Sequence, residues 1–276
     1  MNETEVFDAA VVGEVPNGLP AEVRQHDMHL LLEQQGFVRV RDLSRRFGVS
    51  TVTVRHDLQQ LEEQHLARRV HGGAMPVGRT ARVERSFEEV ATEQALQKAE
   101  IARAAADLVS SGESILIDVG TTTTAVAQEL IARTDLNDLT VFTSGITIAL
   151  ALEAAHPRFS IVVTGGTLRP KQHSLVDPLA GAMLASLRVD TVFLGCNGVD
   201  TEAGVTNINL PEAAIKRSMI DAAARCVVVA DATKLGAQAL APVCQLDEVD
   251  VLVTDSDAPE GFVTTAKSRG VDVIVA

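Results

Sequence analysis

Residues 49–61, with the sequence VSTVTVRHDLQQL, decide the fold of the N-terminal part of this chain. Ser50 stands where a helix would begin, and a serine hydroxyl there accepts a hydrogen bond from a free backbone N–H of the first turn. Val54, Leu58 and Leu61 follow at i, i+4 and i+7, so they share one face of that helix. We expect this apolar face to pack inward. The residues then presented near the N-terminal end are Thr51, Thr53, Arg55 and His56.

Two further helices are predicted upstream of this segment. Residues 22–35 and residues 40–47 each carry apolar side chains at helical spacing. Gly48 and Val49 then form a tight connection to the helix that begins after Ser50. A short helix, a turn that contains glycine and a second helix make a helix-turn-helix, whose second helix enters the major groove of DNA.

A small β wing is expected after the third helix. Residues 66–70 form an apolar and basic run that is followed by a turn at Gly72-Gly73. Basic side chains on such a wing are suited to contact phosphates. The predicted DNA-binding residues are therefore Ser50, Thr51, Thr53, Arg55, His56, Arg68, Arg69 and His71.

The charge distribution agrees with this prediction only when it is divided along the chain. The formal net charge of −13 argues, taken as a whole, against a nucleic-acid partner. Residues 39–85, however, contain ten arginines against five acidic residues, which makes this segment +5. A basic segment inside an acidic chain is typical of a nucleic-acid-binding part.

The same segment resembles a known family. Residues 49–58, the pair 61–62 and residues 69–74 resemble the DNA-binding signature of DeoR/GlpR-type transcriptional regulators, and the likeness covers residues 24–75. It implies a winged helix-turn-helix that binds a double-stranded DNA operator. One departure is His56, where the family usually has arginine or lysine.

The rest of the chain predicts an α/β domain. The stretch 86–110 has the pattern of one or two helices, and short apolar segments alternate with helical ones after it. This alternation indicates βαβ units and a mainly parallel sheet covered by helices, with ligands bound beyond the carboxyl ends of the strands. The candidate strands are 114–118, 139–143, 159–163, 190–195, 226–230, 250–254 and 271–275.

Glycine and hydroxyl residues follow several of these strands. Glycine permits close backbone approach, and a new helix directs free N–H groups at an anion. Three such turns at equivalent strand ends favour a phosphate or polyol pocket. The predicted effector-binding residues are Asp118, Gly120, Thr121, Thr122, Thr123, Ser144, Gly145, Gly165, Gly166, Asn197, Asp200, Glu212, Lys216 and Lys234.

This region also resembles the effector domain of DeoR/GlpR-type regulators, in residues 117–122, 163–166, 195–200 and 229–236. The resemblance implies a ribose-5-phosphate-isomerase-like fold that binds a phosphorylated sugar or a related metabolite. Asp177 departs from the family, where many relatives have glycine.

Several of these residues have structural alternatives. Asp57 is suited to brace a neighbouring arginine, and Thr51 to support the start of its helix. Asp118 either orders the threonine loop or accepts a bond from a sugar hydroxyl, and Lys234 is either a phosphate ligand or a solvent-facing lysine. Residues 169–174 carry polar groups that would discriminate between ligands.

An active phosphosugar isomerase with a DNA-binding appendage is the rival interpretation. Isomerisation through an enediol needs a positioned base and a second group that moves protons. The isomerases that this domain resembles have two carboxylates around a glycine turn, followed by Lys-Gly-Gly. This sequence has Asn197 and Asp200 at the matching positions and no Lys-Gly-Gly. We therefore expect binding without turnover.

The expected domain organisation is a disordered tail over 1–20, a winged helix-turn-helix over 21–75, a linker over 76–90 and an effector-binding and oligomerisation domain over 91–276. Helix-turn-helix proteins bind paired half-sites, so a homo-oligomer, dimer or tetramer, is expected. The cysteine spacing suits neither a disulfide framework nor a metal site, and we expect no metal and no cofactor apart from the effector. No apolar run is long enough for a membrane span, and the protein is expected to be cytoplasmic.

Overall fold

The computed structural model describes residues 20–276, with the exception of residues 36, 65, 71 and 77–83. The predicted tail therefore lies, apart from residue 20, outside the described residues. The chain divides into two compact units, Met1–Val77 and Gly78–Ala276. Among the described helices, none is long and apolar enough to cross a membrane.

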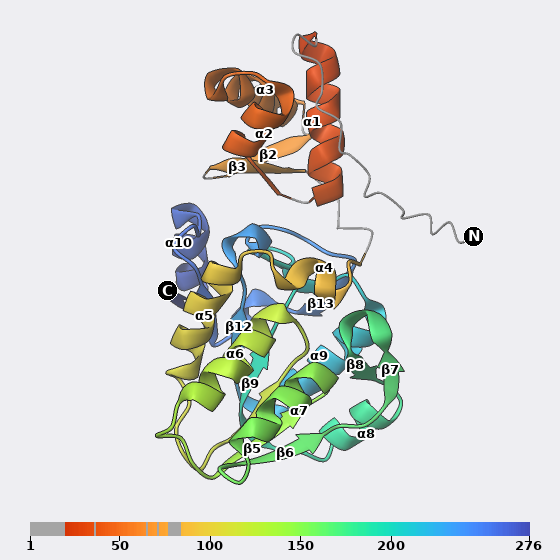
Figure 1. Ribbon diagram of the computed structural model, residues 1–276, viewed down its shortest axis with the longest axis vertical. Coiled ribbons are helices and arrows are strands. Elements are labelled where there is room, and N and C mark those ends of the chain that lie inside the picture. Colours follow the sequence, from red (N-terminus) through yellow and green to blue (C-terminus); the bar gives the residue numbers. More distant parts are fainter. Residues whose placement is uncertain (1–19, 36, 65, 71, 77–83) are drawn as a thin grey trace, which may run out of the picture. The chain divides into compact units, whose positions relative to one another are not determined.

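The smaller unit is a helix-turn-helix with a β wing, as predicted (Figure 1). Its helices begin and end close to the predicted positions, and strand β1 adds a third member to the antiparallel wing, in the order β1-β3-β2. The elements are α1 (Ala21–Gln35), β1 (Val38–Arg39), α2 (Val40–Phe47), α3 (Thr51–Glu63), β2 (Ala67–Val70) and β3 (Gly73–Pro76).

The predicted apolar stripe of α3 forms part of the core of this unit. Val54, Leu58 and Leu61 are buried against Met28 and Leu32 of α1, among others. The turn between α2 and α3 depends on Gly48, whose φ of 63° lies in the left-handed region that favours glycine. The two helices are thereby joined by the short connection that the sequence predicts.

The larger unit is built on one seven-stranded sheet in which every pairing is parallel. All seven strands coincide, within a few residues, with the seven apolar segments identified from the sequence. In spatial order they are β15 (Asp272–Val275), β14 (Val251–Thr254), β12 (Ala223–Val229), β9 (Val189–Leu194), β4 (Ser114–Ile117), β5 (Leu139–Thr143) and β6 (Phe159–Val163).

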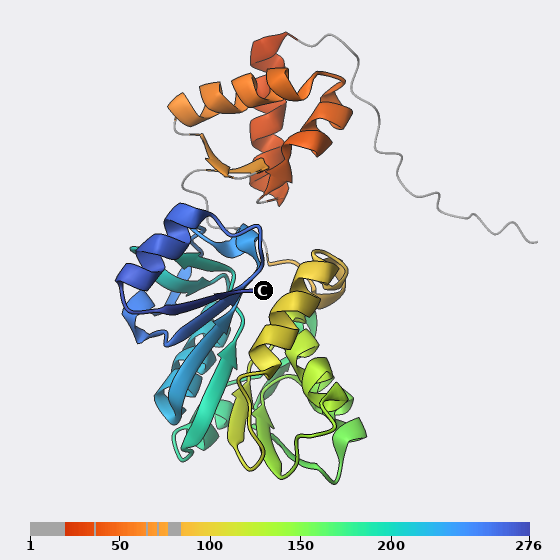
Figure 2. The same cartoon turned by 90° about the vertical axis from the view of Figure 1, so that its left-hand side faces the viewer.

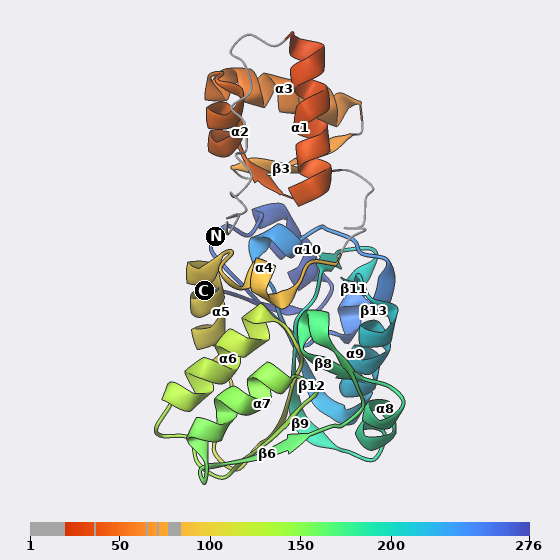
Figure 3. The same cartoon turned by 45° about the vertical axis from the view of Figure 1, so that its right-hand side comes forward.

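Helices cover both faces of this sheet. The helices α5 (Ala95–Ala106), α6 (Thr121–Ala132) and α7 (Ile146–Leu152) pack with one apolar cluster of the strands. The second cluster lies on the opposite face and includes residues of α8 (Leu179–Leu184), α9 (Leu210–Ala222) and α10 (Glu260–Ser268). Figure 2 shows α10 (blue) across the sheet from α5 and α6 (yellow and green), and Figure 3 shows α8 and α9 across it from α6 and α7.

Short elements complete the unit, and the sequence did not predict them individually. The helix α4 (Phe87–Ala91) lies within the stretch 86–110, which was expected to be one or two helices. Three short strands form an antiparallel sheet, and two others form a hairpin. These strands are β10 (Gly198–Asp200), β11 (Gly204–Asn207) and β13 (Ala241–Cys244), and then β7 (Thr167–Arg169) and β8 (Ser174–Val176).

Candidate functional site

The N-terminal end of α3 carries the central residues of the predicted DNA contact. Ser50 caps the helix, because its Oγ accepts a hydrogen bond from the Thr53 N–H at 3.1 Å and lies 2.9 Å from the Thr53 Oγ1. Arg55 and His56 are exposed, and Thr51 is partly exposed. The helix therefore presents a cation and an imidazole to solvent while the hydroxyls of Ser50 and Thr53 order its first turn.

Asp57 has the bracing role that the sequence left open. Its carboxylate is 1% exposed and accepts hydrogen bonds from Arg24 Nε at 2.6 Å, Arg24 Nη2 at 3.0 Å and Gln25 Nε2 at 3.0 Å. The carboxylate holds the pKa of the Arg24 guanidinium above its usual value. Because both partners come from α1, Asp57 fixes α3 to the first helix.

The wing carries two of the three basic residues assigned to it. Arg68 and Arg69 are exposed on β2, and the backbone N–H of Arg69 donates to Glu62 Oε1 at 2.9 Å. That bond links the start of the wing to the last turn of α3. His71 lies outside the described residues.

In the larger unit, most of the predicted effector residues follow strands of the parallel sheet, which end at one edge, whereas Asp200 lies in β10 and Glu212 and Lys216 lie in α9. Gly120, the N-cap of α6, has a φ of 139°, a value that favours glycine. Its carbonyl accepts hydrogen bonds from the hydroxyls of Thr123 at 3.0 Å and Thr124 at 2.7 Å. Thr121 and Thr122 remain partly exposed in the first turn of the helix. The first two threonines are thus available to a ligand, whereas the third is buried and supports the turn.

The turns after β5 and β6 pack against a neighbouring segment of backbone. Ser144 is buried, and its carbonyl accepts a hydrogen bond from the Leu175 N–H at 2.8 Å. A Cβ on Gly166, where φ is 121°, would lie 2.2 Å from the Val176 carbonyl oxygen. Gly145 and Gly165 complete these turns, and Gly165 has open space beside it. The hairpin β7–β8 therefore lies against the ends of β5 and of the edge strand β6.

Asp118 and Lys216 form a buried ion pair between the end of β4 and α9. Their side chains are 2% and 3% exposed, and Lys216 Nζ contacts Asp118 Oδ2 directly. Gly195, at the end of β9, joins both residues: its N–H donates to Asp118 Oδ2 at 3.0 Å, and its carbonyl accepts from Lys216 Nζ at 3.0 Å. Burial raises the pKa of the Asp118 carboxyl, and the ammonium of Lys216 opposes this shift.

Glu212 is buried in the first turn of α9 and collects three donors. Arg169 Nη1 contacts its Oε1, the Ser174 hydroxyl donates to the same oxygen at 2.6 Å, and Asn207 Nδ2 lies 3.5 Å from its Oε2. Arg169 also donates from Nη2 to Glu84 Oε2 at 2.6 Å. One guanidinium is therefore shared between two carboxylates that are far apart in the sequence.

Asn197 and Asp200, the pair that bears on the isomerase alternative, both have local structural partners. The Asn197 Oδ1 accepts a hydrogen bond from the Ile208 N–H at 2.9 Å. The Asp200 Oδ1 accepts from the N–H groups of Glu202 at 2.9 Å and Ala203 at 3.0 Å, which closes the turn between β10 and β11. The carboxylate thus orders a hairpin turn.

Lys234 stands in the turn after β12 and is partly exposed. A lysine that sequence reasoning missed, Lys98 of α5, lies close enough for the two charges to interact, together with Asp231. Lys98 is 7% exposed, and its Nζ donates to the Val90 carbonyl at 2.7 Å. The sequence feature that identifies Lys98 as buried is its position on the apolar face of a helix, three and seven residues before Ile101 and Ala105.

Residues 84–88, part of the predicted linker, are held by the segment between β7 and β8. Beside the Glu84–Arg169 pair, Gln172 Nε2 donates to the Arg85 carbonyl at 2.5 Å. His173 lies 3.0 Å from Glu88 Oε1 through its Nε2, and its ring centroid is 5.3 Å from that of Phe87. These contacts fasten the beginning of the larger unit to the hairpin that packs against the ends of β5 and β6.

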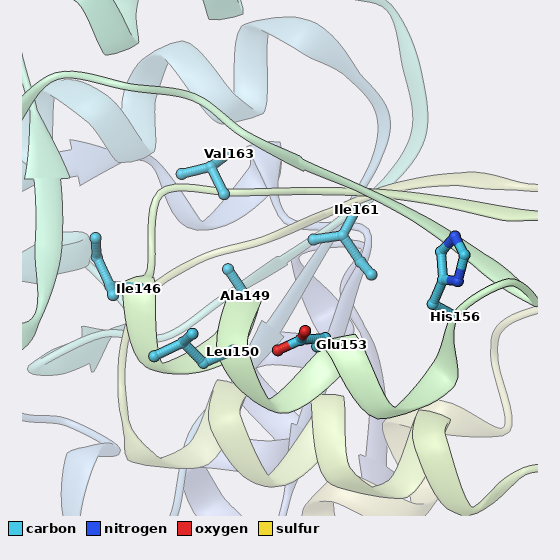
Figure 4. Close-up of a pocket in the computed structure, with 7 residues that line it drawn as sticks. All are labelled: Ile146, Ala149, Leu150, Glu153, His156, Ile161 and Val163. Atoms are coloured by element: carbon cyan, nitrogen blue, oxygen red, sulfur yellow. The ribbon is translucent and has the colours of Figure 1, made fainter.

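A separate hollow lies between α7 and the edge strand β6 (Figure 4). Its lining is mostly apolar and includes none of the predicted effector residues. Polar loops of the kind that suits a phosphate are therefore found at the strand ends and not in this hollow. The lining residues are Ile146, Ala149, Leu150, Glu153, His156, Ile161 and Val163.

Comparisons with known proteins agree with this arrangement. The family model of the DeoR C terminal sensor domain matches residues 93–256, and that of the DeoR-like helix-turn-helix domain matches residues 24–79. The chain belongs to the DeoR family. This DeoR-family chain is therefore a transcriptional regulator with a DNA-binding unit and a sensor unit.

Curated relatives resemble this DeoR-family chain over most of its length. The HTH-type transcriptional regulator GlpR of Haloferax volcanii is 34% identical, over 93% of this chain and 98% of the relative. The HTH-type transcriptional repressor CsqR of Escherichia coli is 30% identical over 93% and 96%. The glycerol-3-phosphate regulon repressor of the same organism is 30% identical over 83% and 88%.

Among solved structures, ribose 5-phosphate isomerase A from Methanocaldococcus jannaschii is 18% identical, over 50% of this chain and 53% of that chain, with a TM-score of 0.38. The probable sor operon regulator from Shigella flexneri is 13% identical, over 76% and 97%, with a TM-score of 0.39. Similarity at these scores does not establish a shared activity.

Proposed function

We propose that this DeoR-family regulator is a repressor whose DNA binding is controlled by a phosphorylated sugar or a related metabolite. The observation that carries the proposal is that three turns rich in glycine and hydroxyl residues follow the adjacent parallel strands β4, β5 and β6. The first of these turns, which contains Gly120 and Thr121, is also the start of α6. In parallel sheets this edge is where ligands bind, and a helix N-terminus favours an anion. The repressors among the relatives, one of which is named for glycerol 3-phosphate, support the same class of effector.

The DNA-binding half is tested with an operator selected from a random duplex library by the full-length protein. Arg55→Ala removes the exposed cation from the recognition helix and should weaken specific binding by about 5- to 150-fold, which corresponds to the 1–3 kcal/mol of a base contact. Arg188→Ala, an exposed arginine of the larger unit, is the matched control and should bind normally. Undiminished binding by Arg55→Ala at fixed salt would contradict the assignment of α3.

The effector half is tested by thermal unfolding with a panel of sugar phosphates. A ligand present at about 100 times its Kd should stabilise the folded state by about 2.7 kcal/mol. The ligand that does so should also change the affinity for the selected operator, by about 5- to 150-fold for a coupling of 1–3 kcal/mol. A panel in which no compound changes either property would contradict control by this class of metabolite.

We also propose that the regulator acts as a homo-oligomer in the cytoplasm and uses no cofactor beyond its effector. A helix-turn-helix protein that reads a paired operator needs two copies of α3 related by symmetry. Sedimentation of the protein with and without operator tests this expectation. A single copy bound to a single half-site at saturation would contradict it.

The isomerase alternative is disfavoured by the partners of Asn197 and Asp200. An amide does not act as a general base, and the Asp200 carboxylate is hydrogen-bonded to two backbone N–H groups of its own turn. We expect no turnover of ribose 5-phosphate, and a measured turnover that Asp200→Ala abolishes would overturn this expectation.

A further inference from the structure

Val52 is an apolar residue on the exposed side of α3 that the predicted DNA contacts did not include. Its side chain is 71% exposed, and among the described residues of the smaller unit it is the most exposed of the large apolar side chains. It is the second residue of the helix, directly after Thr51. The proposed function directs this end of α3 at DNA, so the chemistry of Val52 bears on which base pairs the helix accepts.

The exposed residues of α3 form one stripe along the helix. Positions i+3, i+4 and i+7 from Val52 lie on the same side of the helix as Val52 itself. They are occupied by Arg55, His56 and Gln59, all of which are exposed. The opposite side is the apolar stripe that packs into the core of the smaller unit. Val52 is thus the N-terminal member of a surface that faces solvent.

The charges on this exposed stripe differ between its two ends. The N-terminal half carries Arg55 and the imidazole of His56, and the first turn of α3 contains no acidic residue. An acidic residue there would interact favourably with the helix dipole but would repel the phosphates of DNA. The C-terminal end carries Glu63, whose Oε1 accepts a hydrogen bond from Gln59 Nε2 at 3.1 Å. The end that contains Val52 is therefore the end whose charge is complementary to DNA.

A valine side chain offers a base pair in the major groove only an apolar contact. It has no donor or acceptor, so it leaves the amino group of adenine or cytosine, or the O6 and N7 of guanine, without the hydrogen bond that water would otherwise supply. Thymine differs from these bases because it presents a C5-methyl group in the same groove, on which apolar side chains pack. A base pair that contacts Val52 is therefore most favourable when it presents the methyl group of thymine.

We propose that Val52 contacts the C5-methyl group of a thymine in each half-site of the operator and thereby selects that base. The inference rests on the proposed function, because it concerns what α3 recognises once it binds DNA. Arg55, on the next turn of the same stripe, contributes a positive charge, whereas Val52 contributes only a preference for the methyl group. Loss of Val52 should therefore weaken binding to the operator and leave the affinity for duplexes of unrelated sequence unchanged.

The test uses the full-length protein and the operator that it selects from a random duplex library. Each thymine position is replaced in turn by deoxyuridine in both half-sites, which removes the methyl group and keeps the base pair. At one position this change should weaken binding by the wild type by about 4-fold for each methyl group. Val52→Ala should bind the thymine and the deoxyuridine operators with the same Kd.

Two further variants show whether this response belongs to Val52. Val52→Ile keeps a branched apolar side chain and should remain sensitive to deoxyuridine. Val23→Ala, which changes an exposed valine of α1, is the matched control and should respond as the wild type does. Far-UV circular dichroism establishes that Val52→Ala is folded, and Val52→Ser takes its place if it is not.

The outcomes separate this inference from the proposed function. If no deoxyuridine substitution weakens binding by the wild type, or if Val52→Ala is weakened as much as the wild type is, Val52 does not select a thymine. When this happens with an operator whose binding depends on Arg55, the inference alone is overturned. A wild-type protein that selects no operator contradicts the proposed function, and the inference falls with it.

Discussion

Lys216→Met tests the buried ion pair that links the ends of β4 and β9 to α9. The substitution removes the ammonium that contacts Asp118 Oδ2 and donates to the Gly195 carbonyl at 3.0 Å. Asp118 then retains one hydrogen bond, from the Gly195 N–H, in a position where its side chain is 2% exposed. Removing one partner of such a pair leaves an uncompensated buried charge, and the free energy of unfolding should fall by about 3–5 kcal/mol.

The loss is measured by urea unfolding followed by far-UV circular dichroism, because the chain has no tryptophan and no tyrosine for intrinsic fluorescence. Lys267→Met, on the exposed face of α10, is the control and should change the free energy of unfolding by less than about 0.5 kcal/mol. The double variant Asp118→Asn with Lys216→Met should lose less than the sum of its single variants, because neither charge is then left alone.

The pH dependence of Lys216→Met has a definite sign. Burial raises the pKa of the Asp118 carboxyl, and without Lys216 only the hydrogen bond from the Gly195 N–H opposes that shift. A carboxyl group with a raised pKa in the folded state destabilises the protein above that pKa and stops doing so once it is protonated. The difference between the variant and the wild type should therefore shrink as the pH falls. A loss below about 1 kcal/mol at pH 7, or a loss independent of pH, would refute the reasoning.

Three further predictions concern single side chains. Ser50→Ala should lower the stability of the smaller unit by about 1 kcal/mol in urea unfolding, because the cap of α3 is lost. Burial raises the pKa of the Cys196 thiol to about 12, so native protein at pH 8 should alkylate there far more slowly than unfolded protein. Burial also lowers the pKa of Lys98, so the unfolding free energy should rise as the pH increases toward 10.5, and Lys98→Met should lose this rise.

The fold was largely accessible from the sequence, because its main elements bury continuous apolar segments. The residues 115–117 of β4 and 226–229 of β12 are buried in the middle of the sheet, so they form short uninterrupted apolar runs that can be found without an alignment. The strands β10 and β11 were missed because they are only three or four residues long and contain glycine and polar residues. Their pairing depends on contacts between distant segments, which the local pattern does not contain.

The sequence predicted where in the sheet the candidate site lies, but not which of its side chains contact one another. The residues at the strand ends follow from the strands themselves, so Asp118, Gly120 and Ser144 were identified correctly as residues at this edge. That Asp118 contacts Lys216, across 98 positions of sequence, could not be inferred from either residue alone. Whether each predicted residue touches an effector or DNA stays a prediction. Lys98 was not predicted because it lies within α5 and not in a turn that follows a strand, although it shares the apolar face of that helix.

The shared guanidinium of Arg169 limits how regulators of this kind can be recombined. Glu84 is among the first described residues of the larger unit, and it is bound to Arg169 together with the buried Glu212. A chimera that joins a foreign DNA-binding domain to this sensor should therefore keep the native residues from Glu84 onward. A junction placed after Phe87 would replace Glu84, whose carboxylate binds Arg169. It would also replace Phe87, whose ring lies beside that of His173. The useful boundary for such exchange lies inside residues 77–83, earlier than the first helix of the sensor suggests.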